Sequence, residues 1–349
     1  MSDLLLPYEP VGKIPTEELM KRALSDLKED PKCRKNDIAA IQQWLKKEPH
    51  LKNAPVDDED MILLFLRGCK FSLEKTKKKL DNYFTMRGAL PEFFRNTDPK
   101  QPILQEILKL GIYLPLPNVY DHLGRQVLIM RFGNYDPGKY SPEDLTKISY
   151  MIFESAFGHD DQGQIMGFAA VADMRGATLA HMVSFSPTVM KKSMTFFQDA
   201  SPARPKSFIY IHVPSGFETM FNLFKGFMSQ KLQSRLNVLG NNVEALYDQV
   251  PKDRLPPDLG GTLPMTYQQL TDYWYERVMS KRDLIIAREK YPDLSYWPKS
   301  IRFIHLERNQ ITQWDPRLNA LHGITHLNLE DNELKSTAEI SNLRSLQKV

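Results

Sequence analysis

The sequence lacks several features that would place it in a well-marked class of protein. It has only two cysteines, Cys33 and Cys69, too few for a disulfide framework or a cysteine-based zinc site, so we expect a reducing compartment. No run of 18 or more apolar residues exists, as a membrane-spanning helix would need. The N-terminus has no signal-peptide pattern. We therefore expect a cytoplasmic protein whose association with membranes is peripheral and transient.

Strong charge and catalytic motifs are missing as well. The net charge of +3 is too balanced for a nucleic-acid binder, so any basic patch must be local. The sequence contains no H-E-x-x-H, no G-x-S-x-G and no glycine-rich phosphate loop. We expect Glu154 and Asp173 to be buried acids that pair with an arginine or bind a ligand hydroxyl. The sequence thus predicts a protein that is not an enzyme, with no catalytic residue, metal or cofactor.

Residues 205–240 form the most distinctive stretch. The apolar run 208–213 predicts a buried strand, which Pro214 and Gly216 end. A helical pattern then extends toward Gly240. Its bulky face is phenylalanine and methionine only, which suits a wall that opens or fits an apolar molecule, with an ordinary core helix as the alternative. The face consists of Phe217, Met220, Phe221, Phe224, Phe227 and Met228.

The rest of the pattern predicts two folded parts. Apolar residues at helical spacing indicate a helical module at residues 15–95, whose lysine-rich face is either solvated or turned to a membrane. In residues 113–261 strands alternate with helices, with strands at 127–132, 168–173 and 208–213 and a last one at 245–247. This alternation predicts an α/β fold with a mostly parallel central sheet, in a domain at residues 100–290.

Several motifs, in a fixed order, give the chain a family resemblance. They are the acidic start and Phe-Leu-Arg before Phe71, and the segments 121–132, 172–176, 236–242 and 255–261. Over about residues 15–290 the chain resembles the CRAL-TRIO lipid-binding family. The resemblance implies a domain that encloses one lipophilic molecule, such as a retinoid or a tocopherol. It also implies a mobile gating helix, which corresponds to residues 216–228.

Apolar residues of the predicted strands and helices supply the expected lining of the cavity. Burial of apolar ligand surface, at roughly 25 cal/mol per Å², would be the main source of affinity. We expect some of these residues to line the cavity and the rest to be core. The candidate ligand-binding residues are Ile129, Phe132, Phe153, Phe157, Phe168, Val171, Met190, Met194, Phe197, Ile209, Ile211, Phe217, Phe221, Phe224 and Met228.

The resemblance further implies a basic cleft beside the gate, which binds phosphoinositide head groups and triggers release. Lys231 and Arg235 fall on two of its positions, and Arg204 or Lys206 supplies a third. The fourth is an arginine in the family and Cys69 here, a departure from the family pattern, with Lys70 next to it in the sequence. A phosphoinositide-containing membrane is therefore an expected partner. The candidate phosphoinositide-binding residues are Lys231, Arg235, Arg204, Lys206 and Lys70.

Residues 295–349 follow a different pattern. The spacing I-x-x-I-x-L-x-x-N-x-I that begins at Ile301 returns as I-x-x-L-x-L-x-x-N-x-L at Ile324, and a third copy begins at Leu343. This pattern resembles leucine-rich repeats, in which each unit contributes one short strand. Two copies are too few for an independent solenoid. The tail is a truncated array, a docking edge for a protein partner or an error in joining coding segments, and we expect it to pack weakly on the lipid-binding domain.

Three functions remain open from the sequence. The first is intracellular binding and transfer of a small lipophilic ligand, with phosphoinositide-assisted exchange at membranes. The second is transfer of phosphatidylinositol or another phospholipid by the same fold. The third is a protein-interaction role in which the leucine-rich tail is the working part.

Overall fold

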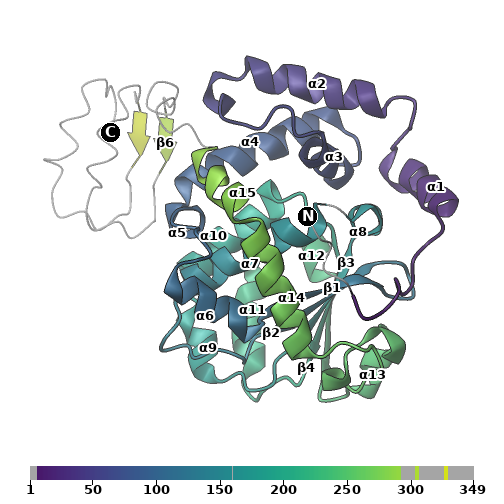
Figure 1. The fold of residues 1–349 in the computed structure, drawn as a ribbon. Coiled ribbons are helices and arrows are strands. Elements are labelled where there is room, and N and C mark those ends of the chain that lie inside the picture. The colour runs from purple at the N-terminus through teal and green to yellow at the C-terminus, as the bar shows by residue number, and fades with distance from the viewer. Residues whose placement is uncertain (1–5, 159, 292–302, 306–325, 329–349) are drawn as a thin grey trace, which may run out of the picture.

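The computed structural model describes residues 6–158, 160–291, 303–305 and 326–328. In Figure 1 the helices α2, α3 and α4 lie together at one end of the molecule, and α14 runs across the central sheet. The α-helices are α1 Thr16–Leu27, α2 Arg34–Lys47, α3 Glu59–Gly68, α4 Leu73–Ala89, α5 Pro91–Phe94, α6 Pro102–Leu110, α7 Pro142–Phe157, α8 Asp161–Met166, α9 Leu179–Ser184, α10 Pro187–Thr195, α11 Phe217–Gly226, α12 Gln230–Gln233, α13 Glu244–Tyr247, α14 Tyr267–Ser280 and α15 Arg282–Ala287. Short turns of 3-10 helix are η1 Pro49–Leu51, η3 Lys252–Arg254, η4 Pro257–Leu259 and η5 Arg288–Lys290, and η2 Phe196–Ala200 is a π-helix.

The central sheet has five strands, which pair in the order of the sequence. Strand β1 is antiparallel to β2, and β2 to β5 are parallel. The predicted α/β class with a mostly parallel sheet is confirmed. The strands are β1 Tyr113–Tyr120, β2 Gln126–Arg131, β3 Phe168–Asp173, β4 Pro205–Ile211 and β5 Leu236–Gly240.

Local sequence explains where the main helices begin. The Asp58 side chain accepts a hydrogen bond from the Met61 amide at 2.9 Å and so caps α3. Ser141 caps α7 by accepting from the Asp144 amide, and Pro142 supplies the fixed φ that suits a first helical position. These caps set the helices that carry the N-terminal apolar cluster and one wall of the cavity described below.

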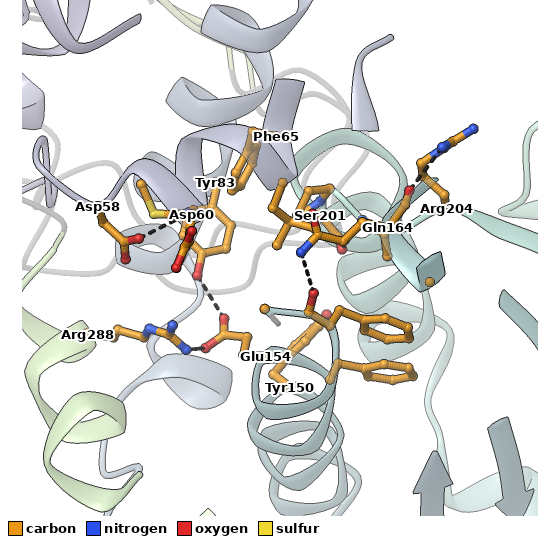
Figure 2. A pocket seen from close by; sticks show the side chains of 18 of the residues that line it. Asp58, Asp60, Phe65, Tyr83, Tyr150, Glu154, Gln164, Ser201, Arg204 and Arg288 are labelled. Atoms are coloured by element: carbon orange, nitrogen blue, oxygen red, sulfur yellow. Dashed lines mark hydrogen bonds and ion pairs between the residues drawn. The ribbon is translucent and has the colours of Figure 1, made fainter. Parts of the chain in front are cut away.

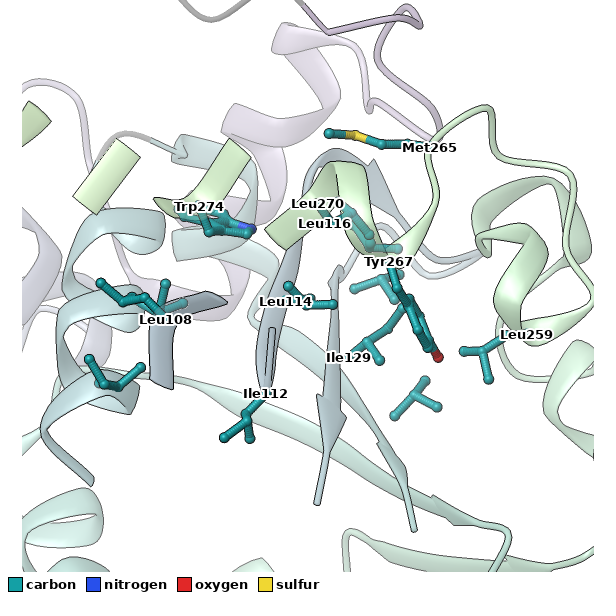
Figure 3. Close-up of a cluster of buried hydrophobic side chains, with 14 of the residues drawn as sticks. Leu108, Ile112, Leu114, Leu116, Ile129, Leu259, Met265, Tyr267, Leu270 and Trp274 are labelled. Atoms are coloured by element: carbon teal, nitrogen blue, oxygen red, sulfur yellow. The ribbon is translucent and has the colours of Figure 1, made fainter. Parts of the chain in front are cut away.

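The two faces of the sheet bury different sets of side chains. On one face Ile129, Val171 and Ile209 stand side by side in register and are fully buried. They share a cluster with Leu270 and Trp274 of α14, and Figure 3 shows these α14 side chains lying over the strands. The opposite face carries a second cluster, which includes Leu128, Met130, Ala170, Ala172 and Tyr210 and reaches α7 and α11.

The N-terminal helices form an apolar cluster of their own. Phe65, Phe84 and Phe93 are fully buried there, and Phe196 of the π-helix joins them. Phe196 lies within the predicted second domain but packs with the first, so this cluster does not mark a boundary between them. The domain boundaries at residues 15–95 and 100–290 stay predictions. A buried Arg67 also links α3 to α8, since its guanidinium donates to Glu29 and to Gln164 at 2.7 Å.

Two predictions about the sheet are wrong. The helical pattern of 217–240 ends at Gly226, and the chain then forms the short α12 and the edge strand β5. Glycine weakens the helix there, and β5 gains its structure from pairing with β4. The strand predicted at 245–247 is instead the single helical turn α13, which begins where the Asn242 side chain accepts from the Ala245 amide. An apolar run of three residues does not distinguish strand from helix.

Most of the predicted leucine-rich repeats lie outside the described residues. Strands β6 Phe303–His305 and β7 His326–Asn328 pair in parallel, with Ile304 opposite Leu327. They occupy corresponding positions in the two predicted copies. The repeat architecture, its weak packing and a protein partner for it stay predictions.

Candidate functional site

A hollow of about 310 Å³ lies between the sheet and helices α7, α9, α10 and α11. Tyr113 and Tyr210 line it from the strands, and Met182 and Phe185 line it from α9 and its end. Most of the side chains around it are phenylalanine, tyrosine or methionine, so the hollow suits an apolar guest. We call this space the main cavity.

Helix α11 closes one side of the main cavity with aromatic rings. The rings of Phe217 and Phe221 stack with centroids 4.7 Å apart, and Phe221 meets the edge of Tyr210 at 5.0 Å. The helix starts after Gly216, whose φ of +81° is one that glycine adopts without strain. On its outer side Leu223 is 40% exposed. A helix is therefore present within the predicted range 216–228 as the short element α11, and its role as a gate stays a prediction.

The structure brings eight of the predicted ligand-binding residues together around the main cavity. They come from the end of β2, from α7, from α10 and the π-helix, and from α11. They are Phe132, Phe153, Met190, Met194, Phe197, Phe217, Phe221 and Phe224. Their role in binding a ligand is taken up below as a proposal.

Seven predicted residues do not line the main cavity. Four belong to the opposite face of the sheet, because a strand buried on both faces is apolar throughout and its sequence does not reveal which face meets the cavity. They are Ile129, Val171, Ile209 and Ile211. Phe157 and Phe168 line a second, neighbouring hollow. Met228 follows the end of α11 and packs with Met194 and Leu232.

Sequence reasoning missed several polar groups in the cavity. Thr146, Ser149 and Ser193 line it, and the buried Ser193 hydroxyl oxygen has no hydrogen-bond partner among the described residues. A buried hydroxyl without a partner is costly, so a ligand atom that pairs with it would be favoured. Ser193 lies next to two predicted cavity residues, Met190 and Met194, on the same helix. This spacing could have identified Ser193 from the sequence as a lining residue.

The five predicted phosphoinositide-binding residues form a single basic cluster. Burial lowers the pKa of Lys206 to about 8, and repulsion from Arg204, Arg235 and Lys70 adds to this shift. Burial also lowers the pKa of Lys231, again with repulsion from Arg235 and Lys70. These mutual effects place the five cations close together, and an anion bound among them would relieve their repulsion.

Two arginines of the basic cluster are held in place by backbone carbonyls. Arg204 Nη1 donates to Gln164 O at 3.0 Å, and Arg235 Nη1 donates to Pro205 O. Burial lowers the pKa of Arg204 to about 10, with Arg235 contributing further. Cys69, at the position expected to be basic, is a buried thiol whose pKa is raised mainly by burial. The cluster is thus preorganised without a cation at residue 69.

The buried acids serve structural pairing, as predicted. Asp173 is bound by Arg175 at 2.7 Å and by His212 at 2.9 Å, and Glu154 is bound by Arg87. Within the described part of the chain, no three His, Cys, Asp or Glu side chains gather as a metal site. None of the helices described is long and apolar enough to cross a bilayer.

Comparison with known proteins places this geometry in context. Residues 113–261 match the CRAL/TRIO domain, and residues 30–104 match the Pinta-like UBA domain. A human protein described as Alpha-tocopherol transfer protein-like is 30% identical over 264 residues, 75% of this chain and 75% of that protein. Human Clavesin-2 is 26% identical over 247 residues, 71% of this chain and 75% of that protein. The crystal structure of Sfh5 covers 78% of this chain and 99% of its own, with a TM-score of 0.45 and 15% identity.

Proposed function

The chain belongs to the CRAL/TRIO domain family, and from that premise we propose that it binds one small lipophilic molecule in the main cavity and exchanges it at phosphoinositide-bearing membranes. A retinoid, a tocopherol or a molecule of similar size is the proposed cargo. The observation that carries the proposal is an apolar hollow of about 310 Å³ behind an aromatic helix. Removal of apolar ligand surface from water would supply the affinity.

The surface around the mouth of the cavity supports exchange at a membrane. On α9, His181 and Met182 face the cavity, whereas Leu179 is 69% exposed and Val183 is 62% exposed. On α11, Leu223 is also exposed. Two helices that line the hollow therefore present apolar side chains to the outside, as a lipid-facing surface requires.

The basic cluster supplies the electrostatic part of this proposal. Lys70, Lys231 and Arg235 lie where α3 ends and where α12 leads into β5, next in the chain after the gating helix α11. Each lysine or arginine near an acidic lipid surface contributes about 1 kcal/mol to binding. Phosphoinositide head groups, which concentrate negative charge, are the proposed anions.

Organic extraction of the purified protein tests the proposed function. We expect mass spectrometry of the extract to show one lipophilic molecule per chain, or the delipidated protein to take up added retinol or tocopherol. A phospholipid in the extract would support the second candidate, phospholipid transfer, which the polar Thr146, Ser149 and Ser193 in the cavity favour. An empty extract with no uptake of any of these molecules would defeat both.

A further inference from the structure

A second hollow of about 150 Å³ lies between the N-terminal helices and α7, α8 and α15. Its inner wall is aromatic and includes Phe65, Phe157 and Phe168. Figure 2 shows Asp58, Asp60 and Arg288 toward one side of this space and Arg204 toward the other. We call it the second cavity.

The two cavities share part of their lining. Tyr150 and Phe153 of α7, together with Ser201 and Ala203 before β4, border both spaces, and we call these four residues the shared wall. The neighbouring π-helix follows the same division, because Phe196 lines the second cavity and Phe197 lines the main cavity. The common lining residues make the two hollows direct neighbours, so a single extended molecule can contact both.

The second cavity also contains a cation without an acidic partner. Lys281 Nζ donates to Ser155 O at 3.2 Å, and no carboxylate lies within 4 Å of it among the described residues. Burial lowers the pKa of Lys281 to about 8, and Arg277 and Arg288 repel it further. Three carboxylates line this cavity: Glu154 binds two arginines, Asp58 caps α3, and Asp60 is exposed and forms no ion pair with Lys281.

We propose, resting on the proposed function above, that the two cavities hold one long-chain amphiphile with an acidic head group. The head group lies at Lys281 in the second cavity. The apolar chain passes between the side chains of the shared wall and ends in the main cavity. An anionic oxygen would give the half-buried ammonium the partner it lacks, through a charge-assisted hydrogen bond. The aromatic wall would cover the first part of the chain, and the main cavity would hold its end.

The test of the head-group site uses the full-length, delipidated protein with stearate and octadecanol as probes. Lys281→Met keeps most of the apolar stem and removes the charge. We expect it to weaken stearate binding at least about tenfold and to leave octadecanol binding unchanged. Lys32→Met is the matched control, because Lys32 is exposed and lines neither cavity. Equal affinity of Lys281→Met and wild type for stearate would overturn the proposal.

The test of the shared wall compares stearate with decanoate. Ala203→Leu adds bulk to the shared wall, where the proposed ligand would pass from one cavity to the other, and should weaken stearate binding much more than decanoate binding. Ala177→Leu, which borders only the main cavity, should affect both alike. Circular dichroism checks the fold of each variant. If Ala203→Leu does not fold, the smaller substitution Ala203→Val is used in its place. An unchanged preference between the two chain lengths would contradict a shared ligand. Uptake of retinol without any stearate would remove this inference and leave the carrier function in place, whereas uptake of neither would remove both.

Discussion

Arg87 Nη1 of α4 lies 2.7 Å from Glu154 Oε1 of α7, and this partly buried ion pair joins the N-terminal helices to the sheet domain. Arg288 Nη1 contacts the other carboxylate oxygen at 2.6 Å, and the Tyr83 hydroxyl donates to Oε1 at 2.8 Å. One carboxylate therefore connects α4, α7 and the turn that follows α15. This junction forms one end of the second cavity.

Removal of this carboxylate should destabilise the fold. Glu154→Gln leaves the buried Arg87 and the half-buried Arg288 without a counter-charge, and we expect the free energy of unfolding in urea at pH 7 to fall by about 3 kcal/mol. Glu276→Gln, at an exposed position of α14, should change it by less than about 0.5 kcal/mol. Similar stabilities for the two variants would contradict a stabilising role for the junction.

The same carboxylate should make the stability of the fold depend on pH in the acidic range. Burial alone would raise the pKa of Glu154, but Arg87 and Arg288 outweigh it and hold the pKa below its ordinary value. The stabilisation by Glu154 is therefore complete above the pKa that this group has in the unfolded chain. It is lost as the pH falls through the lower pKa that Glu154 has in the folded protein. Denaturation curves between pH 6 and pH 2 should show a smaller loss of stability for Glu154→Gln than for wild type.

Charge reversal in the basic cluster should weaken membrane binding. We expect Lys231→Glu to lower affinity for vesicles that contain phosphoinositide by at least about fivefold at low salt, with retinol or tocopherol uptake unchanged. The difference should shrink in high salt, because screening reduces surface electrostatics. Lys32→Glu makes the same charge change outside the cluster. Equal vesicle binding by the two variants would exclude Lys231 from the membrane contact.

Vesicle binding should also fall as pH rises from 7 to 9. The pKa of Lys206 is lowered by burial and by Arg204 and Arg235 to about 8, so this residue loses its charge in that range. Its charged form is disfavoured in the folded protein, so stability without a membrane should instead rise above pH 8. Sedimentation of the protein with acidic vesicles measures the binding. Lys206→Gln should flatten the pH dependence and Lys281→Met, outside the cluster, should not.

Filling the main cavity should prevent uptake of the ligand. Met190→Trp places a bulky indole ring into the space that Met190 borders, and we expect retinol or tocopherol binding to fall below detection. Overpacking should also cost about 1–3 kcal/mol of stability. Leu223→Trp adds the same ring on the outer side of α11 and should leave uptake intact. Normal uptake by Met190→Trp would place the ligand elsewhere.

The exposed residues of α9 should contribute to membrane binding independently of salt. Leu179→Asp removes an apolar side chain that is 69% exposed, and we expect weaker binding to neutral vesicles by about fivefold, or about 1 kcal/mol. Leu24→Asp changes an equally apolar residue of α1 that is 52% exposed. If both variants bind neutral vesicles as wild type does, α9 does not enter the bilayer.

Much of the sheet could be predicted because buried parallel strands are long apolar runs. The predicted strand at 168–173 coincides with β3, and those at 127–132 and 208–213 differ from β2 and β4 by a few residues. Strand β5 was missed because Asn237 and Gly240 interrupt its pattern, and pairing with β4 stabilises it. Local sequence therefore predicted the central strands and failed at the edge formed by β5.

The candidate site was harder to predict than the fold. The run at β4 is apolar on both faces, so nothing in it distinguished Ile209, which faces α14, from Tyr210, which faces the cavity. The cations at Lys206 and Arg235 were identified by resemblance, and their common location depends on the pairing of β4 with β5. The second cavity depends on packing between segments more than 100 residues apart, which no local pattern encodes.

Each strand of the sheet pairs with the one made just before it, so during synthesis every new strand meets a partner that has already left the ribosome. The face that holds Ile129 and Val171 has no such advantage, because its cover includes Trp274 and Val278 of α14. A nascent chain must therefore carry an incompletely covered apolar sheet until α14 emerges. The demand for chaperones during translation should be greatest in that interval.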